Sequence, residues 1–225
     1  MPTVAHWAWN GNARRYWDFS VAGGIPRIER QVHHYGSPLN AIPLLDHYQY
    51  ETDPSSASAL HDLRVGYGGW LGALTNINQD GFAAQAFHAW PDTMEWDTYS
   101  SDYGSGLLGH MISSTTYLVE SPQFGYLSFG GNVQEDGEVV TVQPRDTVRR
   151  RIYVAPMGLK LKIDAGTIEQ FTFHAATGKL IVKVGAASSE GGRSAKIEWE
   201  DTLGKGVKSN SGPILVLPGV LGFTM

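Results

Sequence analysis

Residues 90–104 of this 225-residue chain gather carboxylates and aromatic rings within one short stretch. The acids are Asp92, Glu95, Asp97 and Asp102, and the aromatic residues are Trp90, Trp96, Tyr99 and Tyr103. Indole and phenol rings stack on the apolar C–H faces of sugars, while carboxylates accept hydrogen bonds from sugar hydroxyls. Glycoside hydrolysis also needs two carboxyl groups about 5–10 Å apart, one of them kept protonated. We therefore predict that the acids are catalytic and the rings are substrate platforms; the alternative is a solvated acidic loop anchored by its aromatic residues.

A second stretch, residues 27–40, contains the groups that a polysaccharide lyase uses. Arg30 and Asn40 could neutralise a uronate carboxylate, which would acidify the neighbouring C–H bond. His34 or Tyr35 could then remove that proton and protonate the leaving oxygen. The alternative is structural: His34 hydrogen-bonds within the core, and Arg30 pairs with a nearby acid. The sequence is consistent with both interpretations.

The N-terminal stretch interleaves tryptophans with Asn and Arg. Three of the seven Trp, namely Trp7, Trp9 and Trp17, lie within eleven residues. Such a stretch is typical of a carbohydrate cleft wall, so we expect Trp7 and Trp9 to bind substrate. Aromatic and basic residues in alternation also bind single-stranded nucleic acid. However, residues 1–116 carry a net charge of −6, which repels phosphate.

Composition excludes several other function classes. The whole chain has a net charge of −5, and all seven Lys lie at or after Lys160, so we expect no nucleic-acid partner. No apolar run approaches the roughly 20 residues that cross a bilayer, so we expect no membrane partner. The chain has no cysteine and shows no metal or nucleotide motif, so we predict neither a metal nor another cofactor. It also shows no signal-peptide pattern.

The second half of the chain has the pattern of short strands separated by turns. Nine runs are β-branched or aromatic, several with period-two alternation: 117–119, 125–129, 139–142, 151–154, 159–163, 171–173, 179–184, 195–199 and 213–217. Turn signals include Gly130–Asn132 and Glu135–Gly137. We predict an antiparallel β-sandwich over residues 117–225, with a last core strand at Ile214–Leu217 and a tail at Val220–Phe223.

The first half, residues 1–116, is less regular. The pattern predicts a buried helix within residues 28–50, with Ser37 as its N-cap and Leu39, Ile42 and Leu45 on one face. Two more helices are predicted over residues 80–90 and 103–114. Residues 55–58 have the composition of an exposed loop, and Gly66–Trp70 that of a linker. We predict a helical segment that is the end of a larger helical domain.

Five stretches carry a resemblance to a known family: Arg27–Leu45, Leu63–Gly69, Leu74–Phe82, Phe87–Gly104 and Phe129–Val133. Together they resemble a large family of bacterial and fungal extracellular proteins that contain a domain of unknown function. The resemblance implies an α+β protein: a partial (α/α) toroid followed by an antiparallel β-sandwich, as in many glycoside hydrolases and polysaccharide lyases. It also implies that this chain is the C-terminal part of a longer protein. It assigns no catalytic residue.

These observations lead to one functional prediction with two alternatives. We predict an extracellular, glycoside hydrolase-like protein that acts on a polysaccharide or oligosaccharide. The alternatives are a polysaccharide lyase and a non-catalytic glycan-binding or structural fragment. Apolar surface left by missing helices would also favour a homo-oligomer.

Overall fold

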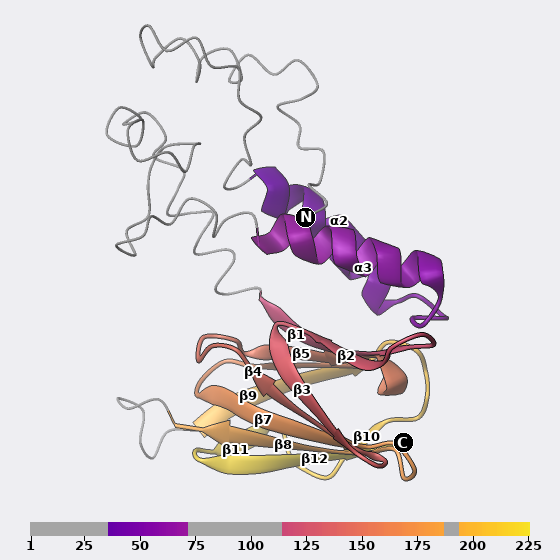
Figure 1. Cartoon of the computed structure of the whole chain (residues 1–225). Helices are drawn as coiled ribbons and strands as arrows, with labels where there is room; N and C mark the ends of the chain where they lie inside the picture. The colour runs from indigo at the N-terminus through magenta and orange to yellow at the C-terminus, as the bar shows by residue number, and fades with distance from the viewer. Residues whose placement is uncertain (1–35, 72–113, 187–193) are drawn as a thin grey trace, which may run out of the picture. The chain divides into compact units, whose positions relative to one another are not determined.

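The computed structural model describes residues 36–71, 114–186 and 194–225 (Figure 1). These residues form parts of two compact units. The first unit contains described residues 36–46 and 61–71, and the second contains residues 47–60, 114–186 and 194–225. The predicted helices over 80–90 and 103–114 lie outside the described residues.

Helix α2 (Gly36–Gln49) confirms the helix predicted within residues 28–50. Its apolar side chains recur at helical spacing, and Ala41, Leu45 and Tyr48 are buried. Ile42, which we expected on the same face, is 41% exposed. The buried stripe therefore follows Ala41 rather than its bulkier neighbour.

Helix α3 (Ala57–Trp70) corrects our prediction of a loop at 55–58 and a linker at 66–70. Ser56 begins the helix, because its Oγ accepts the N–H of Ala59 at 3.2 Å. Glycine normally disfavours a helix, but here Gly66 allows close packing. A Cβ at Gly66 would lie only 3.0 Å from Cδ2 of Leu45 and 3.2 Å from Cβ of Leu44. The glycines that look like a linker thus let two helices of the first unit approach each other.

Two six-stranded sheets dominate the second unit (Figure 1). The strands of the described residues are β1 (Thr115–Ser121), β2 (Gly125–Phe129), β3 (Gly131–Asp136), β4 (Val139–Pro144), β5 (Arg151–Val154), β6 (Leu159–Ile163), β7 (Thr167–His174), β8 (Lys179–Gly185), β9 (Ser194–Asp201), β10 (Lys208–Ser209), β11 (Ile214–Val216) and β12 (Gly219–Thr224). Sheet 1 has the order β11-β9-β6-β5-β1-β2, and sheet 2 has the order β10-β12-β8-β7-β4-β3. The β-sandwich prediction is confirmed in this form.

The sandwich is not wholly antiparallel. Strands β1 and β5 pair in parallel, with Tyr117 opposite Tyr153, while the other described pairs are antiparallel. A parallel pair needs a crossover connection. Here β2, β3 and β4 lie between the two strands in sequence, and β3 and β4 belong to the opposite sheet.

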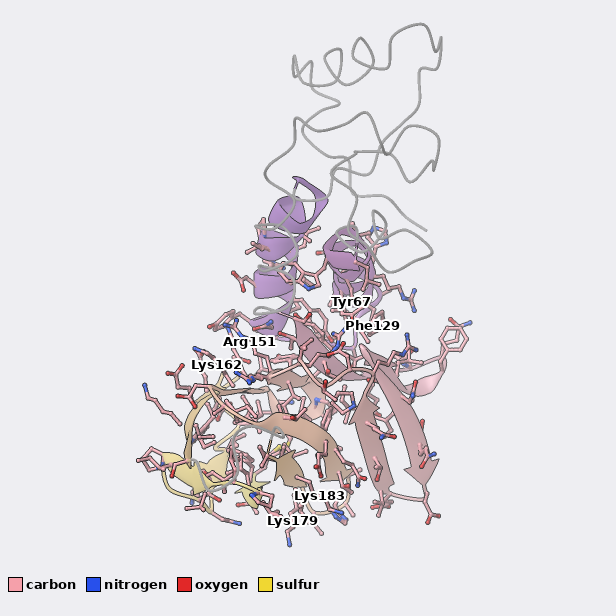
Figure 2. All side chains as sticks on the ribbon, turned by 90° about the vertical axis from the view of Figure 1, so that its left-hand side faces the viewer. Tyr67, Phe129, Arg151, Lys162, Lys179 and Lys183 are labelled. Atoms are coloured by element: carbon pink, nitrogen blue, oxygen red, sulfur yellow. The ribbon has the colours of Figure 1, made fainter. Side chains whose placement is uncertain are left out.

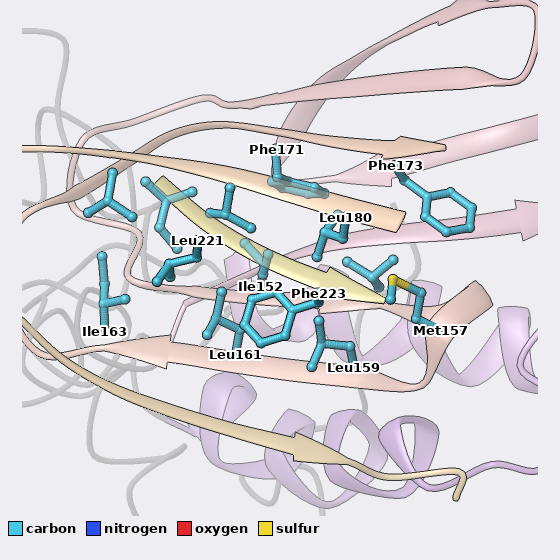
Figure 3. Close-up of a cluster of buried hydrophobic side chains, with 14 of the residues drawn as sticks. Ile152, Met157, Leu159, Leu161, Ile163, Phe171, Phe173, Leu180, Leu221 and Phe223 are labelled. Carbon is cyan, nitrogen blue, oxygen red and sulfur yellow. The ribbon is translucent and has the colours of Figure 1, made fainter. Parts of the chain in front are cut away.

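The interior of the sandwich follows the alternation visible in the sequence (Figure 3). In β6, Leu159, Leu161 and Ile163 point inward, whereas Lys160 and Lys162 point outward. Phe171 and Phe173 of β7 enter the same core from sheet 2. Each such fully buried side chain contributes about 1.5–3 kcal/mol relative to an exposed one.

Two strand predictions were wrong. Residues 131–136, which carry turn signals at both ends, form the edge strand β3, and the turns are made by Gly130 and Gly137 with φ values of 87° and 59°. At the C-terminus the run expected to be a tail is a core strand: β12 pairs with β8 and buries Leu221 and Phe223. The run expected to be the last core strand is the edge strand β11, where Ile214 and Val216 are exposed, although Leu217 just after it is buried in the core.

Candidate functional site

Almost all the predicted site residues lie outside the described residues: Trp7, Trp9, Arg30, His34, Tyr35, Trp90, Asp92, Glu95, Trp96, Asp97, Tyr99, Asp102 and Tyr103. Asn40 lies in the first part of helix α2, and its side chain is not among the described ones. The acid-aromatic stretch at 90–104 and the lyase set therefore remain predictions. The described residues offer two other groups of aromatic side chains.

Three tyrosines form a buried cluster on the outer face of sheet 1. Tyr48, Tyr117 and Tyr153 have ring centroids 5.9–6.1 Å apart. Their hydroxyls are used within the protein: Tyr48 donates to the carbonyl of Pro54 at 3.1 Å, and Tyr153 donates to the carbonyl of Gln49 at 2.9 Å. The side-chain amide of Gln49 donates to the hydroxyl of Tyr117 at 2.9 Å. The cluster fastens residues 47–60 to the sheet.

Burial prevents Tyr48 and Tyr153 from acting as bases. Burial, followed by repulsion from Tyr153 and Tyr117, raises the pKa of Tyr48 far above its ordinary value. Burial also raises the pKa of Tyr153, although its hydrogen bond with Thr202 acts in the opposite direction. A proton-abstracting tyrosine needs an accessible phenolate, so this cluster stabilises the fold and does not perform elimination.

A second aromatic group lies at the C-terminal end of β9 and is accessible. Tyr50 is 50% exposed, and its hydroxyl donates to the carboxylate of Glu200, whose two oxygens both lie at 3.1 Å. The ammonium of Lys160 lies 5.6 Å from the centroid of the Tyr50 ring. An aromatic ring, a carboxylate and an ammonium thus meet on the outer face of sheet 1.

Trp199 lies one residue before Glu200 and points to the opposite side of the strand. Its indole packs edge-on against Phe223 of β12, with centroids 5.9 Å apart, yet 40% of the residue is exposed. Strand β11 pairs only with residues 194–196 of β9, so β9 is an open edge at Trp199. We name this the Trp199 edge: the last part of β9, residues 198–200, with the neighbouring Tyr50.

The backbone of the Trp199 edge also offers hydrogen-bonding groups. The N–H of Ile197 donates to the carbonyl of Pro213 at 2.7 Å, on the side away from β6. Backbone groups alternate along a strand, so the N–H and C=O of Trp199 point to the same side as those of Ile197. No partner for them occurs among the described residues. An exposed indole therefore stands beside a backbone donor and a backbone acceptor that have no partner in the described part of the chain.

Two carboxylates near this edge, those of Glu198 and Asp201, are held in their charged forms. Hydrogen bonds from Lys196 and then Lys162 lower the pKa of Glu198. Burial acts to raise the pKa of Asp201, but the backbone N–H groups of Lys205, Val207 and Gly206 hold it below its ordinary value. A general acid needs a raised pKa, so neither group is suited to protonate a glycosidic oxygen. These two carboxylates therefore do not supply the acid of a hydrolase.

Over the described ranges, no three His, Asp or Glu side chains are grouped so that they could hold a metal ion. No described helix combines the length and the hydropathy of a membrane span.

The fold and this edge define a two-sheet β-sandwich protein with an exposed aromatic margin. The sequence matches a family of unknown function, DUF5695, over residues 1–212, and the chain belongs to that family. No curated protein and no solved structure matches the chain. The predicted membership of a family with a domain of unknown function is therefore confirmed, while the extracellular location and the likeness to glycoside hydrolases stay predictions.

Sequence reasoning identified Trp199 only as the end of a strand at 195–199. Its alternation with Ala195 and Ile197 indicates an inward side chain, which is correct. Its exposure results from the short length of β11, which the sequence pattern does not show. The available signal was composition: Trp199 is the one Trp of the second half, and it lies between two glutamates.

Proposed function

We propose that this chain is part of an extracellular carbohydrate-active protein and that the Trp199 edge binds saccharide. The observation that supports this is the accessible indole of Trp199 beside a backbone N–H and C=O for which the described residues offer no partner. Most exposed apolar side chains need no functional explanation. An indole that is half in the core and half in solvent, next to unpaired polar groups, matches the needs of a pyranose ring.

The chemistry of binding follows from the two kinds of group. The exposed part of the indole would cover the apolar C–H face of one sugar ring. The N–H of Trp199 would donate to a ring hydroxyl, and the C=O would accept from another. Glu198 and Glu200 flank the edge with charge, which also discourages another strand from pairing there. The Trp199 edge would then bind a sugar and would not pair with another protein strand.

For the reaction we propose glycoside hydrolysis, with the acid and base drawn from Asp92, Glu95, Asp97 and Asp102. The lowered pKa values of Glu198 and Asp201 support this division, because they leave the edge with a binding role. Elimination by His34 or Tyr35 is the competing reaction. The two reactions differ in product, since elimination leaves an unsaturated sugar that absorbs ultraviolet light.

The test of binding combines a glycan array with affinity measurements on the full chain. Trp199→Ala should weaken binding of a selected glycan about twofold to twelvefold, the amount expected for one aromatic contact of roughly 0.5–1.5 kcal/mol. Phe124→Ala is the matched control, because Phe124 is 59% exposed in the β1–β2 turn. Trp199→Phe should retain part of the affinity and guards against a general loss of folding.

The outcomes separate the hypotheses. Equal affinities of wild type and Trp199→Ala, with the fold intact, would refute the proposed binding site. Reducing ends without ultraviolet-absorbing products would support hydrolysis, and unsaturated products would support the lyase. Glycan binding with no product from any bound glycan would leave a binding module.

A further inference from the structure

The outer face of sheet 2 carries a group of accessible lysines on adjoining strands. Lys179 and Lys183 lie on the same face of β8 (Figure 2), and the strand register places Lys208 of β10 in the same row as Lys179, with Thr224 between them. All three lysines are exposed. We call this surface, with its neighbours Gln170, Thr172 and His174 on β7, the lysine face.

Among the described residues, these lysines differ from Lys162 and Lys196 of sheet 1 in having no acidic partner. On sheet 1, Glu198 binds Lys162 at 3.1 Å and Lys196 at 3.0 Å, so both ammonium charges are compensated. For Lys179, Lys183 and Lys208, no carboxylate of the described residues lies within salt-bridge distance. The register places one acid, Asp136, in the row of Lys179, but at the far edge of the sheet, beyond His174 and Val139.

The surface around these lysines carries hydroxyl and amide groups, together with the apolar side chains of Ile181 and Val220 and the carboxylate of Glu169 beside Gly185. The hydroxyls of Thr141 and Thr172 are hydrogen-bonded across β4 and β7 at 3.3 Å, and the amide of Gln170 donates to Thr172 at 3.2 Å. Gly222, opposite Ile181, adds no side chain to the face. Hydroxyls and amides in a row suit a ligand rich in hydroxyls, while the ammonium groups require anions on it.

The spacing of the charges further restricts the class of ligand that this face could bind. Four residues along β8 separate Lys179 from Lys183 by about 13 Å, and two strand spacings separate Lys179 from Lys208 by about 10 Å. A nucleic-acid duplex carries one charge per roughly 1.7 Å of its axis and needs a dense basic footprint. A polymer with one anionic group every sugar or two fits the sparse row of lysines better.

We propose that the lysine face binds an anionic polysaccharide, one whose sugars carry carboxylate or sulfate groups. The inference rests on the proposed carbohydrate function and specifies its substrate class. The ammonium groups pair with the anions, and Thr172 and Gln170 bond the intervening hydroxyls. Binding of this kind depends on salt, because the charge pairs lie at the surface.

The experiment measures affinity of the full chain for four probes: polygalacturonate, dextran sulfate, neutral dextran and single-stranded poly-dT. The test variant is Lys179→Gln with Lys183→Gln. The matched control is Lys162→Gln with Lys196→Gln, which removes the same charge from sheet 1. We expect the test variant to lose about fivefold in affinity for an anionic polysaccharide and the control to lose less than about twofold. Wild-type affinity should fall by about tenfold between about 50 and about 200 mM salt.

Each outcome either supports or refutes the binding of an anionic polysaccharide by the lysine face. Loss confined to the test variant, with either the carboxylated or the sulfated polymer, supports the inference and identifies the anion. Equal losses in both variants, no binding of either anionic polymer, or tighter binding of poly-dT would overturn it. If neutral dextran or another neutral glycan binds through Trp199 while the lysine variant is unchanged, the inference fails and the proposed function survives. All the lysines are surface residues, so a thermal unfolding midpoint equal to wild type verifies the fold of each variant.

Discussion

Replacing Tyr153 with phenylalanine removes one hydroxyl group from the interior of the second unit and leaves the ring in place. That hydroxyl donates to the carbonyl of Gln49, the last residue of helix α2, at 2.9 Å. The last carbonyls of a helix have no partner within the helix. Tyr153 is fully buried and Gln49 is 5% exposed, so water does not readily replace the lost donor. The substitution therefore leaves a buried acceptor unsatisfied.

The expected cost follows from that geometry. A buried acceptor left without its donor costs about 1–3 kcal/mol, and one hydroxyl-to-carbonyl bond belongs in the lower part of that range, about 1–2 kcal/mol. For a chain of this size each kcal/mol lowers the unfolding midpoint by about 2–4 °C, so Tyr153→Phe should lower it by roughly 2–8 °C. Thr202 should contribute little, because its hydroxyl keeps its own bond to the carbonyl of Gly158 at 3.0 Å.

The assay is urea and thermal unfolding followed by far-ultraviolet circular dichroism, with Tyr50→Phe as control. That control removes a hydroxyl of the same kind, but its partner is the exposed carboxylate of Glu200. We expect it to cost less than about 0.5 kcal/mol. An unchanged midpoint for Tyr153→Phe, or equal losses in both variants, would refute the view that burial decides the value of these bonds.

Three further predictions concern the same unit. Gly131→Ala should destabilise the sandwich by about 1–3 kcal/mol in urea unfolding, because the new Cβ would lie 2.7 Å from Cγ1 of Val142 and 3.0 Å from the carbonyl of Gln143. Asp201→Ala should lower the free energy of unfolding by about 1–2 kcal/mol at neutral pH, because the Asp201 carboxylate accepts three backbone N–H groups at 2.8–3.1 Å. The pKa of Asp201 is lowered in the folded protein, so the wild type should lose this stabilisation as the pH falls through that pKa. The variant should show no such loss. The raised pKa values of Tyr48 and Tyr153 make stability depend on pH in the opposite direction. The stability that these two neutral phenols contribute is complete below about pH 10 and is lost at higher pH. Tyrosinate absorbance should therefore rise together with unfolding.

The sandwich was predictable because its strands have a two-residue period. In β6 the alternation of apolar residues with lysines predicts which side chains enter the core, and the structure confirms it: Leu159, Leu161 and Ile163 are buried. Helix α3 was missed because Gly66, Gly68 and Gly69 reduce helix propensity. These glycines stabilise the structure only by letting a neighbouring helix pack closely, as the approach of Leu45 to Gly66 shows. A local sequence pattern does not contain that neighbour.

The C-terminal strands and the candidate site show a second limit. Ile214–Val216 and Val220–Phe223 are equally apolar in sequence, and pairing alone decides that one is an edge and the other a core strand. The same pairing exposes Trp199, because β11 ends before it reaches that residue. The tryptophans and acids that the sequence favours, from Trp7 to Tyr103, lie outside the described residues and stay predictions.

Charge connects the two proposals. Residues 1–116 carry a net charge of −6, and residues 117–225 carry +1. If the acids between Asp92 and Asp102 perform hydrolysis, an acidic polymer meets repulsion from the half of the chain that would cleave it. The ion pairs of Glu198 use two of the cations on sheet 1, whereas Lys179 and Lys183 keep their charge available. On these proposals the lysine face supplies the attraction that the acidic half lacks, so neutralising it should raise KM for an anionic substrate and leave kcat unchanged.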